Sequence, residues 1–218
     1  MRKILNRCIV LFISVLLSNS LFAQQDWKLV KDENGIKVYS RMVPGSAIKE
    51  LKTVAKINAK AESFVAVLAD VTAQPKYVYS CIESKLLSYT NKQKQIYYQH
   101  IYVPWPLTNR DGVFFQQIQQ DSITKIITVS AKLLPGYVPT YEDRVRIPKM
   151  NSVWTIYPDP NGGIIGEYYI SINPGGDVPS WIVNLFIEQA PIESVAQLRK
   201  VVELPEYKHA KLPFLLPQ

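Results

Sequence analysis

The most regular hydrophobic pattern in the chain lies near its C-terminal end, between residues 180 and 202. Apolar side chains recur there at spacings near three and four, the period of one face of an α-helix. Residues 175–179, Gly-Gly-Asp-Val-Pro, permit a sharp entry and suit a first helical turn. The sequence therefore predicts one long helix, kinked at Pro191 because proline removes a backbone hydrogen bond. Its apolar stripe consists of Trp181, Leu185, Ile192, Val195, Leu198 and Val202, with Trp181 as the anchor in the core.

Between residues 36 and 173 the pattern changes to short apolar or alternating runs bounded by turn residues, which predicts β-strands. Short connections make neighbouring strands antiparallel. Short helices are expected at residues 27–30, 61–68 and 74–79. A large antiparallel sheet followed by one apolar-faced helix is most simply packed with the sheet curled around the helix. The predicted fold class is α+β, a helix-grip fold in one domain. The predicted strands cover residues 36–41, 48–57, 84–89, 95–103, 112–120, 123–131, 145–157 and 164–173.

The two faces of the predicted sheet do not separate into an apolar and a polar side. In residues 95–103, Tyr98 and His100 stand on one side of the strand and Tyr97 on the other, and Gln116 lies within the next strand. Buried glutamine and tyrosine side chains are costly unless they meet hydrogen-bonding partners or water. An internal cavity would supply water. A solid core beneath an unusually amphipathic sheet is the alternative.

The first residues have the features of a secretory signal peptide, residues 1–23. Arg2, Lys3 and Arg7 give a basic start, residues 8–17 are apolar, and cleavage is expected after Ala23. The apolar stretch is shorter than the ~20 residues of a membrane span. The sequence therefore predicts export, with a periplasmic or secreted protein, and an uncleaved anchor is the alternative.

The remaining chain is expected to form a domain at residues 24–212 and a C-terminal tail at residues 213–218. The full sequence has 25 basic and 18 acidic residues, a net charge of +7, and removal of three basic signal residues leaves 22 against 18, or +4. No basic run is interleaved with aromatic residues, so no nucleic-acid partner is expected, although weak attraction to anionic membrane surfaces remains. Cys8 leaves with the signal and Cys81 is alone. No disulfide, cysteine-based metal site or cofactor is predicted.

Three ordered segments of the chain resemble the StAR-related lipid-transfer (START) domain family. The first, Val-Pro-Trp-Pro-Leu-Thr-Asn-Arg-Asp, is similar to that family's proline-containing loop before a strand. The second joins Arg-Ile-Pro, Ser-Val-Trp and Pro-Asp-Pro. The third resembles the proline-glycine-glycine entry into the family's last helix, and Gly-Ile-Lys-Val-Tyr fits its first strand. The strand motif is residues 35–39 and the first segment is residues 103–111. The second segment is residues 146–148, 152–154 and 158–160, and the third is residues 173–184.

The resemblance implies a helix-grip fold with a tunnel between the curved sheet and the last helix. That tunnel would hold one lipid, such as a sterol, a phospholipid or a fatty acyl chain, beneath a lid formed by residues 103–109 and the helix. Some sterol-carrying members place an acidic residue and an arginine inside the cavity. Here the matching positions are Tyr97 and Gln116. The resemblance therefore puts a sterol ligand in doubt.

Eleven residues are candidates for the cavity and its lid. Arg110, beside Asp111, is either a ligand clamp or an anchor of its own loop. Trp105, between two prolines, is either a lid tip that dips into a membrane or a cap on the core. Glu188 faces the ligand or, alternatively, solvent. The candidates are Tyr98, His100, Trp105, Leu107, Arg110, Gln116, Trp154, Trp181, Asn184, Ile187 and Glu188.

The sequence contains few signals of catalysis. His100 and His209 are its only histidines, so no His-x-x-His metal site occurs, and no Gly-x-Ser-x-Gly motif is present. The leading interpretation is a non-enzymatic carrier or sensor of one hydrophobic molecule. An alternative is a helix-grip cyclase or hydrolase that acts on an apolar substrate in the same pocket, with His100 or an inward glutamate held by a hydrogen-bond partner. Cys81 as nucleophile with His100 as its base is another arrangement of reactive groups. A structural interaction module is the third.

Overall fold

The computed structural model describes residues 26–216. The predicted signal peptide, residues 1–23, lies outside these residues, so the structure does not address it. No helix within residues 26–216 combines the length and hydrophobicity that a membrane-spanning helix requires. In chain order the elements are β1 (Lys28–Glu33), β2 (Ile36–Arg41), β3 (Glu50–Ile57), α2 (Ala61–Ala69), η1 (Val71–Lys76), β4 (Cys81–Asn91), β5 (Lys94–Ile101), β6 (Asn109–Gln120), β7 (Ile127–Leu133), β8 (Arg144–Arg146), β9 (Lys149–Pro158), β10 (Ile164–Asn173), α3 (Ser180–Val201) and α4 (Pro205–Lys208).

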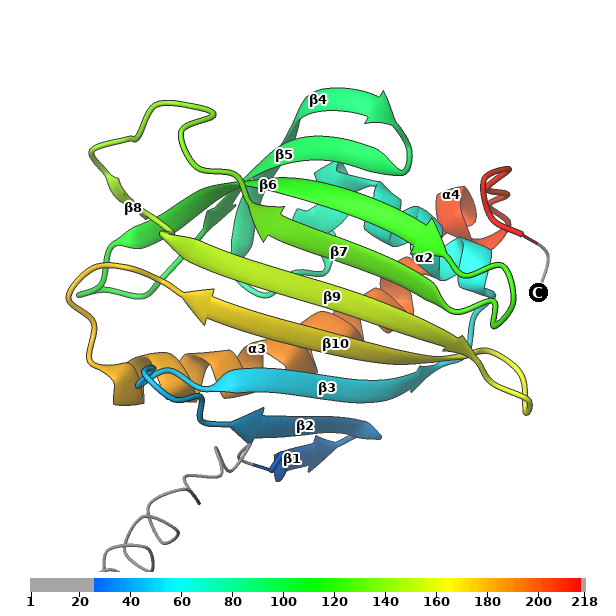
Figure 1. The fold of residues 1–218 in the computed structure, drawn as a ribbon, viewed down its shortest axis with the longest axis horizontal. Helices are drawn as coiled ribbons and strands as arrows, with labels where there is room; N and C mark the ends of the chain where they lie inside the picture. Colours follow the sequence, from blue (N-terminus) through cyan, green and yellow to red (C-terminus); the bar gives the residue numbers. More distant parts are fainter. Residues whose placement is uncertain (1–25, 217–218) are drawn as a thin grey trace, which may run out of the picture.

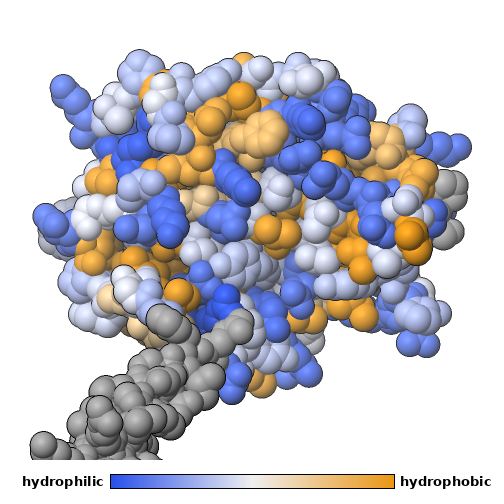
Figure 2. Space-filling model, viewed as in Figure 1, coloured by the Kyte–Doolittle hydropathy of each residue, from blue (hydrophilic) through white to orange (hydrophobic). Residues whose placement is uncertain are grey.

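The strands form one sheet in the order β1-β2-β3-β10-β9-β7-β6-β5-β4. Neighbours along this order are antiparallel, and the short β8 pairs in parallel with the start of β6. α3 crosses behind the sheet, with α2 and α4 on the same side at one end (Figure 1). On the opposite face, hydrophilic and hydrophobic residues are interspersed (Figure 2). The predicted helix-grip fold of class α+β is confirmed.

The second half of α3 forms the centre of the hydrophobic core. Ile192, Val195 and Leu198 are buried against apolar side chains of the sheet and of α2. Arg199 lies in the last turn, where its positive charge interacts favourably with the negative end of the helix dipole. The helix continues through Pro191, whose side chain is buried.

The first half of α3 corrects the predicted apolar stripe. Trp181 is 65% exposed and Leu185 is 63% exposed, so Trp181 is not an anchor in the core. In this half, Ile182, Val183 and Phe186 line the space between the helix and the sheet instead. The helical period identified an apolar helix. It could not show which face of the first half of that helix is turned toward the sheet.

The N-terminal strand was predicted incorrectly as a short helix over residues 27–30. The structure has β1 there, paired antiparallel with β2. Asn34 and Gly35, at φ 53° and 69°, form the two-residue turn between these strands, a combination typical of a tight hairpin. The hairpin places β1 at the edge of the sheet. These residues form a strand because backbone pairing with β2 outweighs the local pattern of four residues.

Candidate ligand-binding cavity

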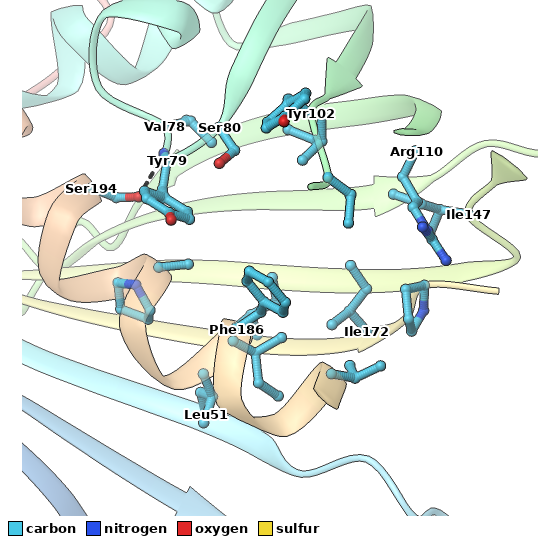
Figure 3. A pocket seen from close by; sticks show the side chains of 18 of the residues that line it. Leu51, Val78, Tyr79, Ser80, Tyr102, Arg110, Ile147, Ile172, Phe186 and Ser194 are labelled. Atoms are coloured by element: carbon cyan, nitrogen blue, oxygen red, sulfur yellow. Dashed lines mark hydrogen bonds between the residues drawn. The ribbon is translucent and has the colours of Figure 1, made fainter. Parts of the chain in front are cut away.

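A cavity of about 280 Å³ lies between α3 and the inner face of the sheet. Its walls are mainly aliphatic and aromatic, and Arg110 is the one lining residue with a charged side chain. Figure 3 shows Leu51, Ile172 and Phe186 around the space, with Arg110 and Ile147 at one end. Ligand pockets in proteins are typically apolar spaces of about 300–1,000 Å³ with few polar groups. The size and lining of this cavity therefore suit a hydrophobic guest.

The loop between β5 and β6 and the first half of α3 border one side of the cavity. Pro104 and Leu107 contribute from the loop, and Ile182 and Phe186 contribute from the helix. The loop is closed by a hydrogen bond from Leu107 N to Pro104 O at 3.0 Å. Trp105, at its tip, is 90% exposed. The border of the cavity thus presents a large aromatic side chain to solvent.

A second space of about 190 Å³ shares walls with the first, including Trp154 and Tyr168. It is lined by several neutral polar groups. Gln99 Nε2 donates to Gln74 Oε1 at 2.6 Å, and Gln116 Nε2 donates to Leu68 O at 3.0 Å. Burial raises the pKa of Tyr168, so its hydroxyl stays protonated at neutral pH. This second space, called the inner space below, therefore offers polar groups to a ligand but no charged side chain.

The structure brings five of the eleven candidate residues to these two spaces. Leu107, Arg110 and Ile187 line the main cavity, Gln116 lines the inner one, and Trp154 lines both. Tyr97, which replaces the acidic residue of some sterol carriers, also lines the inner space. Neutral side chains thus occupy both positions of the absent ion pair.

Tyr98 and His100 do not reach the cavity. Successive side chains of a strand point to opposite faces, and Tyr97, Gln99 and Ile101 take the inner face. Tyr98 and His100 therefore lie on the outer face of β5, which corrects their assignment as cavity residues. Strand alternation separated the two groups in the sequence, but it could not identify which group faces inward.

Tyr98 belongs to a polar cluster on this outer face, together with Asp111, Arg144 and Arg146. Asp111 is 1% exposed and forms an ion pair with Arg146, at 2.7 Å from Arg146 Nε to Asp111 Oδ1. Tyr98 Oη donates to Asp111 Oδ2 at 3.0 Å and accepts from Arg144 Nη1 at 2.9 Å. The cluster fixes the start of β6, and therefore the end of the loop between β5 and β6, to β8.

His100 lies at the margin of this cluster, with Nδ1 at 3.1 Å from Arg144 Nη1. Its Nε2 is buried without a hydrogen-bond partner among the residues that the structure describes. Burial and the positive charge of Arg144 lower the pKa of His100 below its ordinary value near 6.5. The ring is therefore neutral at neutral pH, and His100 has a partner but no contact with the cavity.

This lowered pKa predicts that the protein is less stable in mild acid. As pH falls below about 6.5, His100 in the unfolded chain takes up a proton before the folded protein does, so the free energy of unfolding decreases. Replacement by His100→Gln is expected to reduce that loss. Urea unfolding at several pH values between about 7.5 and 5 measures it, and an equal pH dependence in the two proteins would contradict the assignment.

Three further candidates on α3 also lie away from the cavity lining. Asn184 accepts from Lys49 N at 3.0 Å and donates to Ala47 O at 3.2 Å. Glu188 forms an ion pair with Lys49 Nζ at 2.8 Å. Both residues attach the first half of α3 to the segment before β3 rather than facing a ligand. Trp181 is exposed on the outer side of the same helix.

Several cavity residues were missed in the sequence. Tyr77, Val78 and Tyr79 lie in the connection between η1 and β4, where no periodic pattern marks them. Tyr79 N donates to Ser194 Oγ at 3.0 Å, which fastens this connection to α3 (Figure 3). The positions on α3 had a usable signal, because Val183, Ile187, Ala190 and Ser194 follow one another at three- and four-residue spacing.

Cys81 is buried at the start of β4 and lines neither space. Burial raises the pKa of its thiol to about 12. A thiol with so high a pKa is almost fully protonated at neutral pH and is a poor nucleophile. No group of three or more His, Cys, Asp or Glu side chains within residues 26–216 has the geometry to hold a metal ion. The geometry therefore places neither His100 nor Cys81 where a substrate in the cavity would meet it.

A curved antiparallel sheet that grips a long C-terminal helix over an apolar cavity defines the helix-grip class of proteins. The START domain family model matches residues 13–208 of this chain. The chain belongs to the START domain family, as its ordered sequence segments predicted.

Individual relatives agree with this membership. A crystal structure of a STAR-related lipid transfer protein fragment from Xanthomonas axonopodis superposes with a TM-score of 0.75 at 35% identity, covering 81% of this chain and 98% of that one. An uncharacterized protein of Pseudomonas aeruginosa is 34% identical over 82% of this chain and 88% of its own. The phosphatidylcholine transfer protein of Mus musculus is 26% identical over 73% of this chain and 75% of its own.

Proposed function

We propose that this protein binds one amphiphilic lipid in the cavity beneath α3 and carries it between membranes. The observation that supports this most directly is the cavity itself, an apolar space of about 280 Å³ that the protein's own side chains leave unfilled. Native cores rarely contain empty spaces much larger than a water molecule, because such spaces lose packing energy. A hydrophobic ligand restores that energy.

The magnitudes favour recognition by shape. If a lipid hides roughly 500 Å² of apolar surface, at about 25 cal/mol per Å² the gross gain is about 12 kcal/mol. Association costs on the order of 4–15 kcal/mol, so the net affinity is moderate. A single hydrogen bond, such as one from Gln116, adds about 1 kcal/mol and serves to choose between lipids. Moderate affinity suits a carrier, which must both take up and release its cargo.

Two experiments test the carrier function. Lipids that co-purify after native extraction, identified by mass spectrometry, are expected at about one molecule per chain. Purified protein is expected to accelerate lipid exchange between donor and acceptor vesicles in proportion to its concentration. Absence of any co-purifying lipid, together with no ligand-dependent rise of the melting temperature, would instead support a purely structural role.

Export is part of the same proposal. The basic start, the apolar residues 8–17 and the small Ala23 support transport to the periplasm or the medium. The carrier would then act on the outer side of the inner membrane or beyond. The intact mass of protein recovered from the cell envelope is expected to match a chain that begins at Gln24. A mass that includes residues 1–23 would contradict cleavage.

Trp105 is proposed to contact the membrane while the cavity loads or unloads. It is 90% exposed beside the cavity border, and tryptophan favours the membrane–water interface. If roughly 50 Å² of its ring enters the membrane, Trp105→Ala weakens vesicle binding by about 5- to 10-fold. The melting temperature is expected to change little, since exposed side chains contribute little to stability.

Ile123 supplies the matched control for this variant. It is 89% exposed, equally apolar, and lies in the turn between β6 and β7, away from the lining residues. Vesicle flotation of Trp105→Ala and Ile123→Ala measures the difference. Equal loss of binding in both variants, or no loss in either, would show that the lid loop is not the contact.

A further inference from the structure

Arg110 differs from every other lining residue of the main cavity in carrying a charge. It lies at the start of β6, is 6% exposed, and its guanidinium points into the cavity in Figure 3. Nη2 lies within 3.5 Å of the position that a Cβ on Gly176 would occupy, so the guanidinium also contacts the turn that leads into α3. A buried cation therefore marks one end of an otherwise apolar space.

The charge of Arg110 has no acidic partner among residues 26–216. Its Nη1 donates to Thr108 O, and its Nη2 donates to Gly175 O at 3.3 Å. The neighbouring Asp111 is taken by Arg146, and no carboxylate lies within 4.0 Å of Arg110 in the described part of the chain. Its Nε is buried without any hydrogen-bond partner there. Within the described residues, hydrogen bonds to two neutral carbonyl groups are all that offsets the burial of the Arg110 charge.

Arg199 shows what a satisfied structural arginine looks like in the same protein. Its Nε and Nη2 both donate to Lys56 O, and its Nη1 donates to Asn34 O at 2.8 Å. It is only partly buried and lines neither space. Arg110, by contrast, is buried more deeply, lines the main cavity and leaves its Nε without a partner in the described part of the chain. Burying an incompletely paired charge is costly.

We propose that Arg110 is the head-group site of the cavity and that the natural ligand carries an anionic head, a carboxylate or a phosphate. This rests on the proposed lipid-binding function and specifies its ligand. The fork of donors on a guanidinium matches both anions. Each Nη of Arg110 carries two N–H groups and uses one of them on a backbone carbonyl, so an anion at this end would accept from the remaining Nη groups. The hydrocarbon tail would lie along the apolar wall that includes Trp154 and Leu198.

The lining also distinguishes anionic from zwitterionic heads. Neither space has an aspartate or glutamate among its lining residues. A head that brings its own ammonium group would therefore add a second buried cation without a carboxylate to receive it. The inner space, with Gln99 and Gln116, offers only neutral partners. A single-chain acid fits these groups better than a choline lipid of the same length.

The test compares probes that share one hydrocarbon chain. Palmitic acid, its methyl ester, palmitoyl lysophosphatidic acid and palmitoyl lysophosphatidylcholine compete against a fluorescent fatty acid on the full protein. The two anionic probes are expected to bind about 10- to 100-fold more tightly than the ester, the range that a charge-assisted hydrogen bond supplies. The ratio between acid and lysophosphatidic acid identifies which anion the site favours.

Variants assign the preference to Arg110. Arg110→Gln is expected to abolish the preference for anions, Arg110→Lys to retain part of it, and Arg199→Gln to leave it unchanged. If Arg110→Gln does not fold, the pH dependence of ligand binding to the wild-type protein tests the proposal instead. The affinity for palmitic acid then falls as its carboxylate is protonated, while that for the ester does not.

The outcomes separate this proposal from the carrier function. Equal affinity of the wild-type protein for acid and ester, or an anion preference that survives in Arg110→Gln, overturns the head-group site and leaves the carrier function standing. Tighter binding of lysophosphatidylcholine than of lysophosphatidic acid also overturns it. Failure of all four probes to bind counts against the carrier function itself.

Discussion

Asp111→Asn is expected to lower the free energy of unfolding by about 3–5 kcal/mol, the usual cost of removing one member of a buried ion pair. The carboxylate is 1% exposed and holds both Arg146 and Tyr98. Its loss leaves Arg146 with two backbone carbonyl partners but no carboxylate, and removes an anchor of the start of β6. For a domain of this size, the melting temperature is expected to fall by about 6–20 °C.

Asp143→Asn is the control for that prediction. Asp143 also pairs with an arginine of the cluster, at 2.6 Å from Arg144 Nη2, but its side chain is 64% exposed. The melting temperature is expected to change little, because exposed ion pairs are screened by water. Calorimetry of the two variants compares them directly. Similar losses in both would show that the outer cluster does not act through the buried carboxylate.

Ala190→Phe is expected to abolish most lipid binding while leaving the fold intact. Ala190 lines the main cavity from α3, so a phenyl ring there occupies space that the ligand needs. Displacing three or four methylene groups of the ligand, at about 0.8 kcal/mol each, weakens binding about 100-fold. The variant is not expected to lose stability, since it fills an empty space instead of crowding a packed core.

Leu185→Phe provides the matched control, because Leu185 lies on the same helix but is 63% exposed and does not line the cavity. Its affinity for lipid is expected to equal that of the wild-type protein. Titration with a fluorescent fatty acid compares the variants, and their melting curves show whether each has folded. Full binding by a folded Ala190→Phe protein would place the ligand somewhere other than this space.

The architecture followed from the sequence because its main elements are long and periodic. The run from Ser180 to Val201 has a helical period over many turns, and the short connections between the segments before it favour antiparallel pairing. The hairpin at Asn34 and Gly35 also had a recognisable turn, but the few residues of β1 carried too little pattern to identify a strand. Edge strands gain their structure from pairing, which local sequence does not record.

The site was less predictable, because cavity residues are chosen by tertiary packing. Alternation grouped Tyr98 with His100 but could not show that this group faces outward. Trp181 and Leu185 lay on the predicted apolar stripe, yet in the first half of α3 a different face of the helix, with Ile182, Val183 and Phe186, lines the cavity. Arg110 was found through its motif, but only the structure shows that it lines the cavity and that its partners are carbonyl groups.

The central claim, that one lipid occupies the space between α3 and the sheet, is tested most directly by photolabelling. A fatty acid with a diazirine near the end of its chain is bound to the full protein, irradiated, and the labelled peptides are identified by mass spectrometry. Crosslinks are expected on residues that line the cavity, such as Trp154 and Leu198, at about one label per chain. These crosslinks are expected to disappear in Ala190→Phe. Labelling confined to exposed residues such as Trp181 and Leu185, or unchanged labelling in Ala190→Phe, would contradict the account.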